Sequence, residues 1–137
     1  MGDMTASVGN GASWARRVGA ITLFVENLDA AKRFYQEVFG LHVKFEDDDS
    51  AAFDFGNTII NLLDVAAAPS LIDPARVASR DAGSRVQLTI EVEDVDAVCA
   101  ELSARGVSLL SGPVDRPWGV RTASFVDPGG HIWEIAH

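Results

Sequence analysis

The sequence has little of the chemistry that several classes of protein require. Its single cysteine, Cys99, excludes a disulfide within the chain, as is usual for proteins of the reducing cytoplasm. Only 11 lysines and arginines face 20 aspartates and glutamates, a formal net charge of −9. Nucleic acids and anionic membranes bind through basic side chains, so neither is an expected partner. No apolar run approaches the roughly 18 residues of a membrane span, and residues 1–10 lack a secretory signal pattern, so we expect a cytoplasmic protein.

What the sequence does contain is a duplicated segment. Residues 21–30, ITLFVENLDA, are echoed at a constant offset by residues 88–97, LTIEVEDVDA. Each copy continues into an apolar pattern of helical spacing that ends at a glycine, Gly40 or Gly106. Self-similarity of this kind predicts two copies of one structural unit.

Each copy predicts one strand, one helix and three further strands. In the first copy the strand covers 18–25, Asn27 or Asp29 caps the helix, and short strands follow at 41–46, 51–55 and 58–64. In the second copy a strand at 85–93 and a helix ending at Gly106 precede strands at 107–110, 121–126 and 131–136. The segment Asp127-Pro-Gly-Gly130 predicts a tight turn.

These elements predict one α+β domain with an N-terminal extension. Residues 1–15 are expected to be a disordered tail and 16–137 a single domain. Its units cover 16–65 and 84–137, and residues 66–83 form a linker with a short helix. Two tandem βαβββ units would form curved mixed sheets around a cavity, and such a cavity suits a small molecule.

Three motifs in this arrangement resemble the vicinal oxygen chelate superfamily. They are Leu23-Phe-Val-Glu-Asn-Leu-Asp29, Phe34-Tyr35 with Phe39-Gly-Leu41, and Asp127-Pro-Gly-Gly-His-Ile-Trp-Glu-Ile135. The superfamily includes glyoxalase I, extradiol dioxygenases, and fosfomycin- and bleomycin-resistance proteins. The resemblance covers about 17–137 and implies a glyoxalase/bleomycin-resistance-like fold. It also implies a homodimer with cavities between paired units, although one chain alone closing its own cavity stays open.

The resemblance also identifies four positions that supply metal ligands in metal-using relatives. These positions are Ala20, Asn61, Gln87 and Glu134 here. Alanine has no donor atom, the two amides are neutral, and only Glu134 is anionic, whereas Zn²⁺ or Fe²⁺ prefers imidazole or several anionic ligands. No cofactor is therefore expected, with a weakly held divalent metal at Gln87 and Glu134 as the alternative. The two-histidine site of a dioxygenase is absent from these positions.

Several side chains are candidates for contact with a ligand. Glu134 is the candidate catalytic base; the ordinary alternative is a carboxylate that is solvated or hydrogen-bonded to Gln87 or Asn61. Trp118 would stack on a planar ligand or pack on its own loop, and Arg121 would bind a carboxylate or phosphate or form a surface ion pair. The complete set of predicted ligand-binding residues is Phe24, Asn61, Gln87, Thr89, Trp118 and Arg121.

Two functions of different class follow from these observations. The first is a metal-independent protein that binds a drug or hydrophobic metabolite. The second is a glyoxalase-like lyase or isomerase that uses Glu134 as base, with or without a weakly bound divalent metal.

Overall fold

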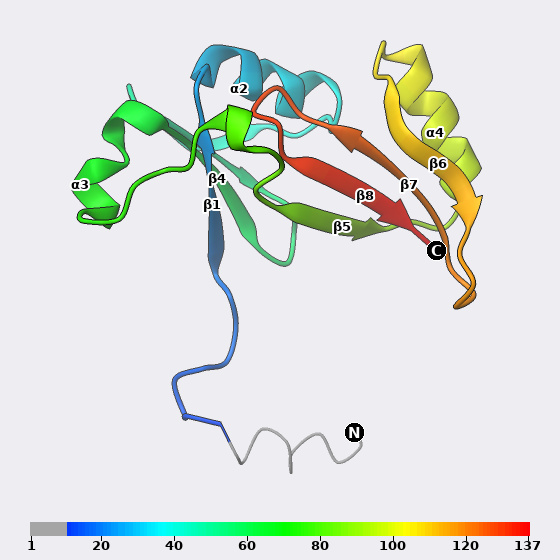
Figure 1. Cartoon of the computed structure of the whole chain (residues 1–137), viewed down its shortest axis with the longest axis horizontal. Helices are drawn as coiled ribbons and strands as arrows, with labels where there is room; N and C mark the ends of the chain where they lie inside the picture. Colours follow the sequence, from blue (N-terminus) through cyan, green and yellow to red (C-terminus); the bar gives the residue numbers. More distant parts are fainter. Residues whose placement is uncertain (1–10) are drawn as a thin grey trace.

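The computed structural model describes residues 11–137, so the predicted tail lies largely outside the described residues. Residues 11–19 run away from the body of the domain as an extended segment (Figure 1). The first unit consists of β1 (Ala20–Val25), α2 (Leu28–Glu37), β2 (Val43–Glu46), β3 (Ser50–Asp54) and β4 (Ile59–Asp64). The second consists of β5 (Gln87–Glu91), α4 (Val95–Ala104), β6 (Leu109–Asp115), β7 (Arg121–Val126) and β8 (Ile132–Ala136).

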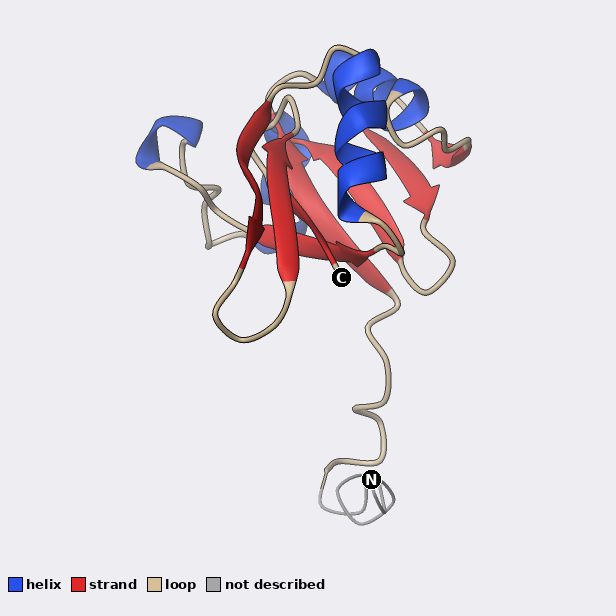
Figure 2. Ribbon diagram, turned by 90° about the vertical axis from the view of Figure 1, so that its right-hand side faces the viewer, coloured by secondary structure: helices blue, strands red, loops and turns tan. Residues whose placement is uncertain are grey.

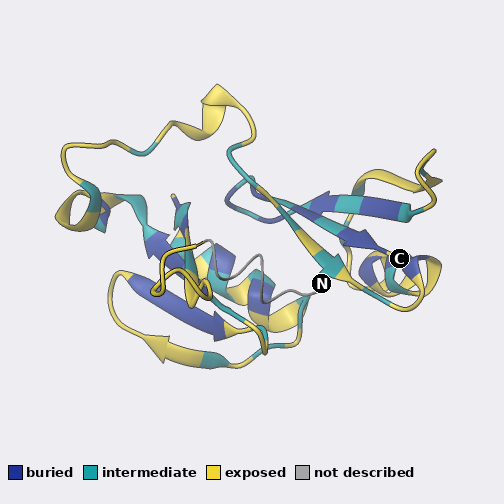
Figure 3. Cartoon of the chain, turned by 90° about the horizontal axis from the view of Figure 1, so that it is seen from below, coloured by how far each residue is buried: buried dark blue, intermediate teal, exposed yellow. Residues whose placement is uncertain are grey.

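The two units are joined by a linker with three short helical turns. These are η1 (Val65–Ala67), α3 (Pro69–Ile72) and η2 (Arg80–Ala82). Most residues of this linker are exposed (Figure 3). No helix within residues 11–137 is long and apolar enough to cross a membrane.

Each unit forms its own four-stranded mixed sheet, which confirms the predicted α+β fold class. The strand orders are β1-β4-β3-β2 and β5-β8-β7-β6, so the two sheets have equivalent topology. In each sheet the first and last strands of the unit are parallel, and the remaining pairs are antiparallel. Among the described residues, β1 and β5 each have one edge without a hydrogen-bonded strand.

The helix α2 begins as its sequence predicts but ends at Glu37, three residues before Gly40. The side chain of Asn27 accepts a hydrogen bond from the backbone N–H of Ala30, which resolves the choice of capping residue in favour of Asn27. Gly40 has φ of 69°, a left-handed conformation that costs glycine little. Figure 2 shows the longer helices beside the strands, while a short helical turn stands apart from them.

The strand β6 is longer than predicted and replaces the first half of the expected loop before β7, residues 111–115. It extends to Asp115 because two register shifts let it follow β7 past Gly112. A Cβ atom at Gly112 would lie 2.5 Å from the carbonyl oxygen of Thr122, so only glycine permits this close approach. Periodicity alone does not reveal such bulges.

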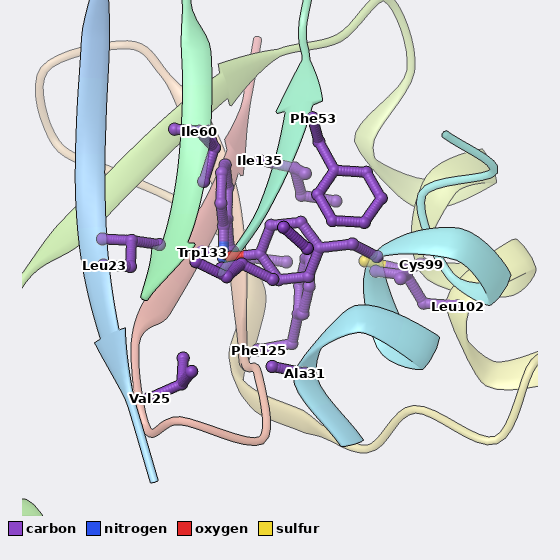
Figure 4. Packing of buried hydrophobic residues seen from close by; sticks show 14 of the residues in the cluster. Leu23, Val25, Ala31, Phe53, Ile60, Cys99, Leu102, Phe125, Trp133 and Ile135 are labelled. Carbon is purple, nitrogen blue, oxygen red and sulfur yellow. Dashed lines mark hydrogen bonds between the residues drawn. The ribbon is translucent and has the colours of Figure 1, made fainter. Parts of the chain in front are cut away.

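The hydrophobic core lies between the helix-covered faces of the two sheets. An aromatic cluster joins the units: Tyr35 and Phe39 from the α2 segment, Phe55 after β3, and Phe125 and Trp133 from β7 and β8. The rings of Phe55 and Trp133 are stacked, with centroids 5.3 Å apart. Figure 4 shows Trp133 and Phe125 of the second unit in the same cluster as Phe53 and Ala31 of the first. The two units therefore share one core.

A buried polar network sits within this aromatic cluster. Asp127 is 3 % exposed and accepts hydrogen bonds from the hydroxyl of Tyr35 at 2.8 Å and from Nδ1 of His131 at 3.0 Å. Burial is the largest single influence on Asp127 and raises its pKa, but the hydrogen bonds and charge of His131, together with the hydrogen bond from Tyr35, outweigh it, so the pKa of Asp127 lies below its ordinary value. Burial, together with the Asp127 charge, raises the pKa of Tyr35, which stays protonated. His131 is thus a structural residue.

Candidate ligand-binding site

Each sheet has one face that its helix leaves uncovered, which we call its open face. Side chains alternate along a strand, so the open face carries the residues between the core positions. In the first sheet these include Ala20, Thr22, Phe24, Ala52 and Asn61. In the second sheet they include Gln87, Thr89, Glu91, Thr122, Ser124, Glu134 and Ala136. The second open face is therefore the more polar of the two.

Glu134 occupies the middle of the second open face. It pairs in register with Thr89 of β5 on one side and with Ser124 of β7 on the other. The hydroxyl of Thr89 donates a 2.9 Å hydrogen bond to Oε1 of Glu134. The expected alternative partners, Gln87 and Asn61, make no such bond. Gln87 lies on the same face but pairs with Ile132, two positions before Glu134.

Asn61 is the counterpart of Glu134 in the first sheet. It pairs in register with Thr22 and with Ala52, while Ala20 pairs with Ile59. Phe24 lies on the same open face and is half-buried. The first open face thus offers the Phe24 ring and the Asn61 amide, and Arg76 lines a pocket with Thr22 and Phe24.

The structure does not gather the four family metal positions into one cavity within a single chain. The faces that pack together are the helix-covered ones, through Tyr35, Phe55 and Trp133. Trp133 and Glu134 are neighbours on β8, so their side chains point to opposite faces. The side chains of Gln87 and Glu134 therefore lie on the open face of the second sheet. Those of Ala20 and Asn61 lie on the open face of the first sheet, which points in a different direction.

These residues do not fit a tight divalent metal site. Ala20 supplies no donor, and Asn61 and Gln87 supply only neutral amide oxygens or nitrogens. Across residues 11–137, no three histidine, cysteine, aspartate or glutamate side chains come together in a metal-binding arrangement. Cys99 is buried in the α4 stripe, and burial raises the pKa of its thiol.

Arg121 and Trp118 occupy different environments in the β6–β7 hairpin. Arg121 shares the helix-covered face of β7 with Ala123 and forms ion pairs with Asp96 at 2.9 Å and Asp115 at 3.0 Å. Its guanidinium is thus engaged away from the open face. Trp118 is 71 % exposed at the tip of the hairpin and is free to contact a ligand.

Arg116 is a residue of the open face that sequence reasoning missed. It begins the turn after β6, and its Nε donates a 2.9 Å hydrogen bond to the hydroxyl of Thr122. Thr122 pairs with Ala136, so its side chain belongs to the second open face. The position of Arg116 on the open face follows from the register of the β6–β7 hairpin. The bulges in β6 alter that register, so strand alternation alone does not identify Arg116.

A cleft of about 620 Å³ lies between the two units at the edge of β5. Its walls are mainly apolar, with the half-buried Ile21 and Phe55 from the first unit and the half-buried Leu88 and Ile90 and the buried Trp133 from the second. Thr89 and Glu91 of β5 lie at the same cleft. The open edge of β5 is therefore flanked by partly exposed apolar side chains.

The fold and the paired units define a protein of glyoxalase-like architecture, and comparison with known sequences places it in a family. The profile of the Glyoxalase/Bleomycin resistance protein/Dioxygenase superfamily matches residues 17–135. The chain belongs to this superfamily. It is 31 % identical over 119 residues to YraH of Bacillus subtilis (strain 168), described as uncharacterized, covering 84 % of this chain and 93 % of YraH.

Solved structures with the same fold include enzymes and proteins named only by family. A glyoxalase/bleomycin resistance protein/dioxygenase from Nocardioides has a TM-score of 0.83 at 23 % identity, covering 98 % of this chain and 91 % of that one. A lactoylglutathione lyase from Agrobacterium tumefaciens has a TM-score of 0.75 at 20 % identity, covering 90 % and 95 %. At these identities the likeness extends to the fold.

Proposed function

We propose that this protein binds a small organic molecule on the second open face, without a tight metal site. The observation that carries the proposal is the Thr89–Glu134 pair at the centre of that face. Glu134 has hydroxyl and amide neighbours in Thr89, Ser124 and Gln87, which suit hydrogen bonding to an organic ligand better than metal coordination. Phe24 and Asn61 of the other open face, with Trp118, would supply further contacts.

The proposal includes a homodimer, because one chain leaves both open faces incomplete. An exposed strand edge offers unpaired N–H and C=O groups to another chain. Side-by-side placement of β1 from one copy and β5 from its partner would bring the Asn61 face beside the Glu134 face. It would also cover Leu88 and Ile90, which are partly exposed in the single chain.

The proposal is tested by measuring metal content and ligand binding on the same untagged, dialysed protein. The protein is offered Ni²⁺, Zn²⁺, Mn²⁺, Fe²⁺ and Mg²⁺ in turn, and bound metal is counted by elemental mass spectrometry. We expect no metal above trace, and saturable ligand binding by fluorescence that a chelator leaves unchanged. A stoichiometric metal that is lost in Glu134→Ala but kept in Glu93→Ala would overturn the proposal.

One observation favours a second function, that of a glyoxalase-like lyase or isomerase. Thr89 engages Oε1 of Glu134, and no described residue donates a hydrogen bond to Oε2. That oxygen is therefore free to accept a proton from a bound substrate. Turnover that is lost in Glu134→Gln while binding is retained would support the enzyme over the binding protein.

A further inference from the structure

Arg116 is held in place by the turn that it begins. Its backbone N–H donates to the carbonyl oxygen of Val120 at 2.7 Å, and its carbonyl accepts from Gly119 at 3.0 Å. Pro117 restricts the backbone, and Gly119 has the left-handed φ of 92° that closes the turn. The root of the side chain is therefore fixed relative to β7.

The side chain of Arg116 lies along the second open face. Its Nε donates to Thr122 Oγ1 at 2.9 Å, and Thr122 is only 3 % exposed. A guanidinium carries five N–H donors, so this bond leaves its two terminal nitrogens available. Neither of them has a hydrogen-bond or ion-pair partner among residues 11–137.

This free guanidinium is unusual in so acidic a chain. Within the described part, the other half-buried basic side chains all pair with a carboxylate: Lys32 with Glu46, Arg85 with Glu26, and Arg121 with Asp96 and Asp115. The basic side chains that lack such a pair, apart from Arg116, are exposed to solvent. Arg116 is thus partly desolvated with its charge uncompensated, an arrangement that an incoming anion would relieve.

The surroundings of Arg116 leave room for a ligand group. In register, Thr122 is followed across the sheet by Ala136 and then by Glu91. At a strand spacing of about 4.8 Å, the backbone of Glu91 stands roughly 10 Å from that of Thr122, and no ion pair joins Glu91 to Arg116 within residues 11–137. Ala136 forms a small floor between them. Trp118, two residues from Arg116 in the same turn, exposes its indole ring.

We infer that Arg116 is the specificity-determining residue of this face and that the ligand is a planar organic oxyanion. Its carboxylate or phosphate binds the terminal nitrogens of Arg116, and its ring lies against Trp118. The inference rests on the proposed function, because it assigns a chemical class to the ligand of the same site. It also assigns the cationic contact with the ligand to Arg116 instead of Arg121, whose guanidinium already forms ion pairs with two aspartates.

The test compares four probes of one shape and different charge. They are 2-naphthoate, 2-naphthyl phosphate, the neutral 2-naphthamide and the cationic 2-naphthylmethylamine, each titrated by calorimetry into the full chain. We expect both anions to bind at least tenfold more tightly than the amide, because charge-assisted hydrogen bonds to arginine are strong. The two anions distinguish a carboxylate ligand from a phosphate.

Two substitutions in the same hairpin separate the site from its surroundings. Arg116→Gln should remove the preference for anions, at least a tenfold loss, while binding of 2-naphthamide stays within twofold. Arg121→Gln, the matched control on the helix-covered face, should keep the preference. Thermal melting of both variants verifies that they are folded.

The failures of the inference and of the proposed function give different results. Binding of the amide or the amine as tightly as the anions, or an unchanged preference in Arg116→Gln, would overturn the inference alone. The inference would also be overturned if the wild type showed no preference for anions and Arg116→Gln dissociated the dimer. That pair of results would mean that a carboxylate of the partner chain binds Arg116. No binding of any probe would overturn the proposed function and the inference together.

Discussion

The hydroxyl of Tyr35 donates a 2.8 Å hydrogen bond to Oδ2 of Asp127, and this bond joins the two units. Tyr35 lies in α2 of the first unit, and Asp127 follows β7 of the second. Both side chains are buried, so the contact is shielded from water and depends on a fixed arrangement of the units. The strand edges and open faces that form the candidate site are oriented by the same arrangement.

Replacing Tyr35 by phenylalanine should lower the free energy of unfolding by about 1–3 kcal/mol, because a buried carboxylate loses a donor. Urea unfolding by circular dichroism measures this value. The matched control is Lys44→Gln, which removes an exposed ion pair and should change stability by less than about 0.5 kcal/mol. A cost for Tyr35→Phe as small as that of the control would contradict the coupling of the units.

Asp127 should make the free energy of unfolding depend on pH in the acidic range. Its folded pKa lies below the ordinary value of 3.8, so the folded state binds this proton less tightly than the unfolded state. The stabilisation is fully present above pH 3.8 and is lost as the pH falls through the lowered pKa. Urea unfolding of the wild type and Asp127→Asn, from pH 6 down to pH 2.5, should show their stability difference shrinking in acid. A difference that is constant with pH would show that Asp127 ionisation does not contribute.

Gly112→Ala should destabilise the protein more than Gly119→Ala, although both glycines have positive φ, 87° and 92°. Alanine strains either backbone by about 1–2 kcal/mol. At Gly112 the new Cβ would also collide with Thr122 and Ala123, whereas no atom lies within 4 Å at Gly119. We expect an additional loss of about 1–3 kcal/mol at Gly112, measured by urea unfolding. Equal losses would mean that β6 shifts away from β7 at little cost.

Ile90→Lys should weaken the proposed dimer, because it places a charge beside the open edge of β5. Phe45→Lys is the matched control: Phe45 is 60 % exposed on β2, at the opposite edge of the first sheet. Sedimentation velocity across a range of concentrations should show at least a tenfold higher dissociation constant for Ile90→Lys and no change for Phe45→Lys. The reverse pattern would place the interface at β2.

Much of the architecture was predictable from local patterns. The repeat around Thr22 and Thr89 predicted two equivalent units, because strand alternation and helical periodicity are local properties. Alternation also placed Thr89 and Glu134 on the same kind of face. Applied to β7, it would have grouped Arg121 with the core residues Ala123 and Phe125, away from Thr122 and Ser124. Arg121 was instead predicted as a ligand contact.

The hydrogen-bond partners within the candidate site were less predictable. A hydrogen bond to Gln87 or Asn61 was one of the alternatives for Glu134, but its partner is Thr89, since register places Thr89 directly opposite. Arg116 was overlooked because its position over Thr122 depends on two irregularities in the β6–β7 pairing. Neither bulge has a periodic signature.

The sequence by itself determined the duplicated strand–helix–strand pattern, the family and the lack of anionic partners for Glu134 at the other family metal positions. These follow from residue types and their spacing along the chain. Only the tertiary structure decided that the helix-covered faces share one core, that Tyr35 meets Asp127, and that Arg116 lies over the open face. Such contacts join residues far apart in sequence or across a bulged hairpin, and their geometry depends on packing that no local pattern encodes.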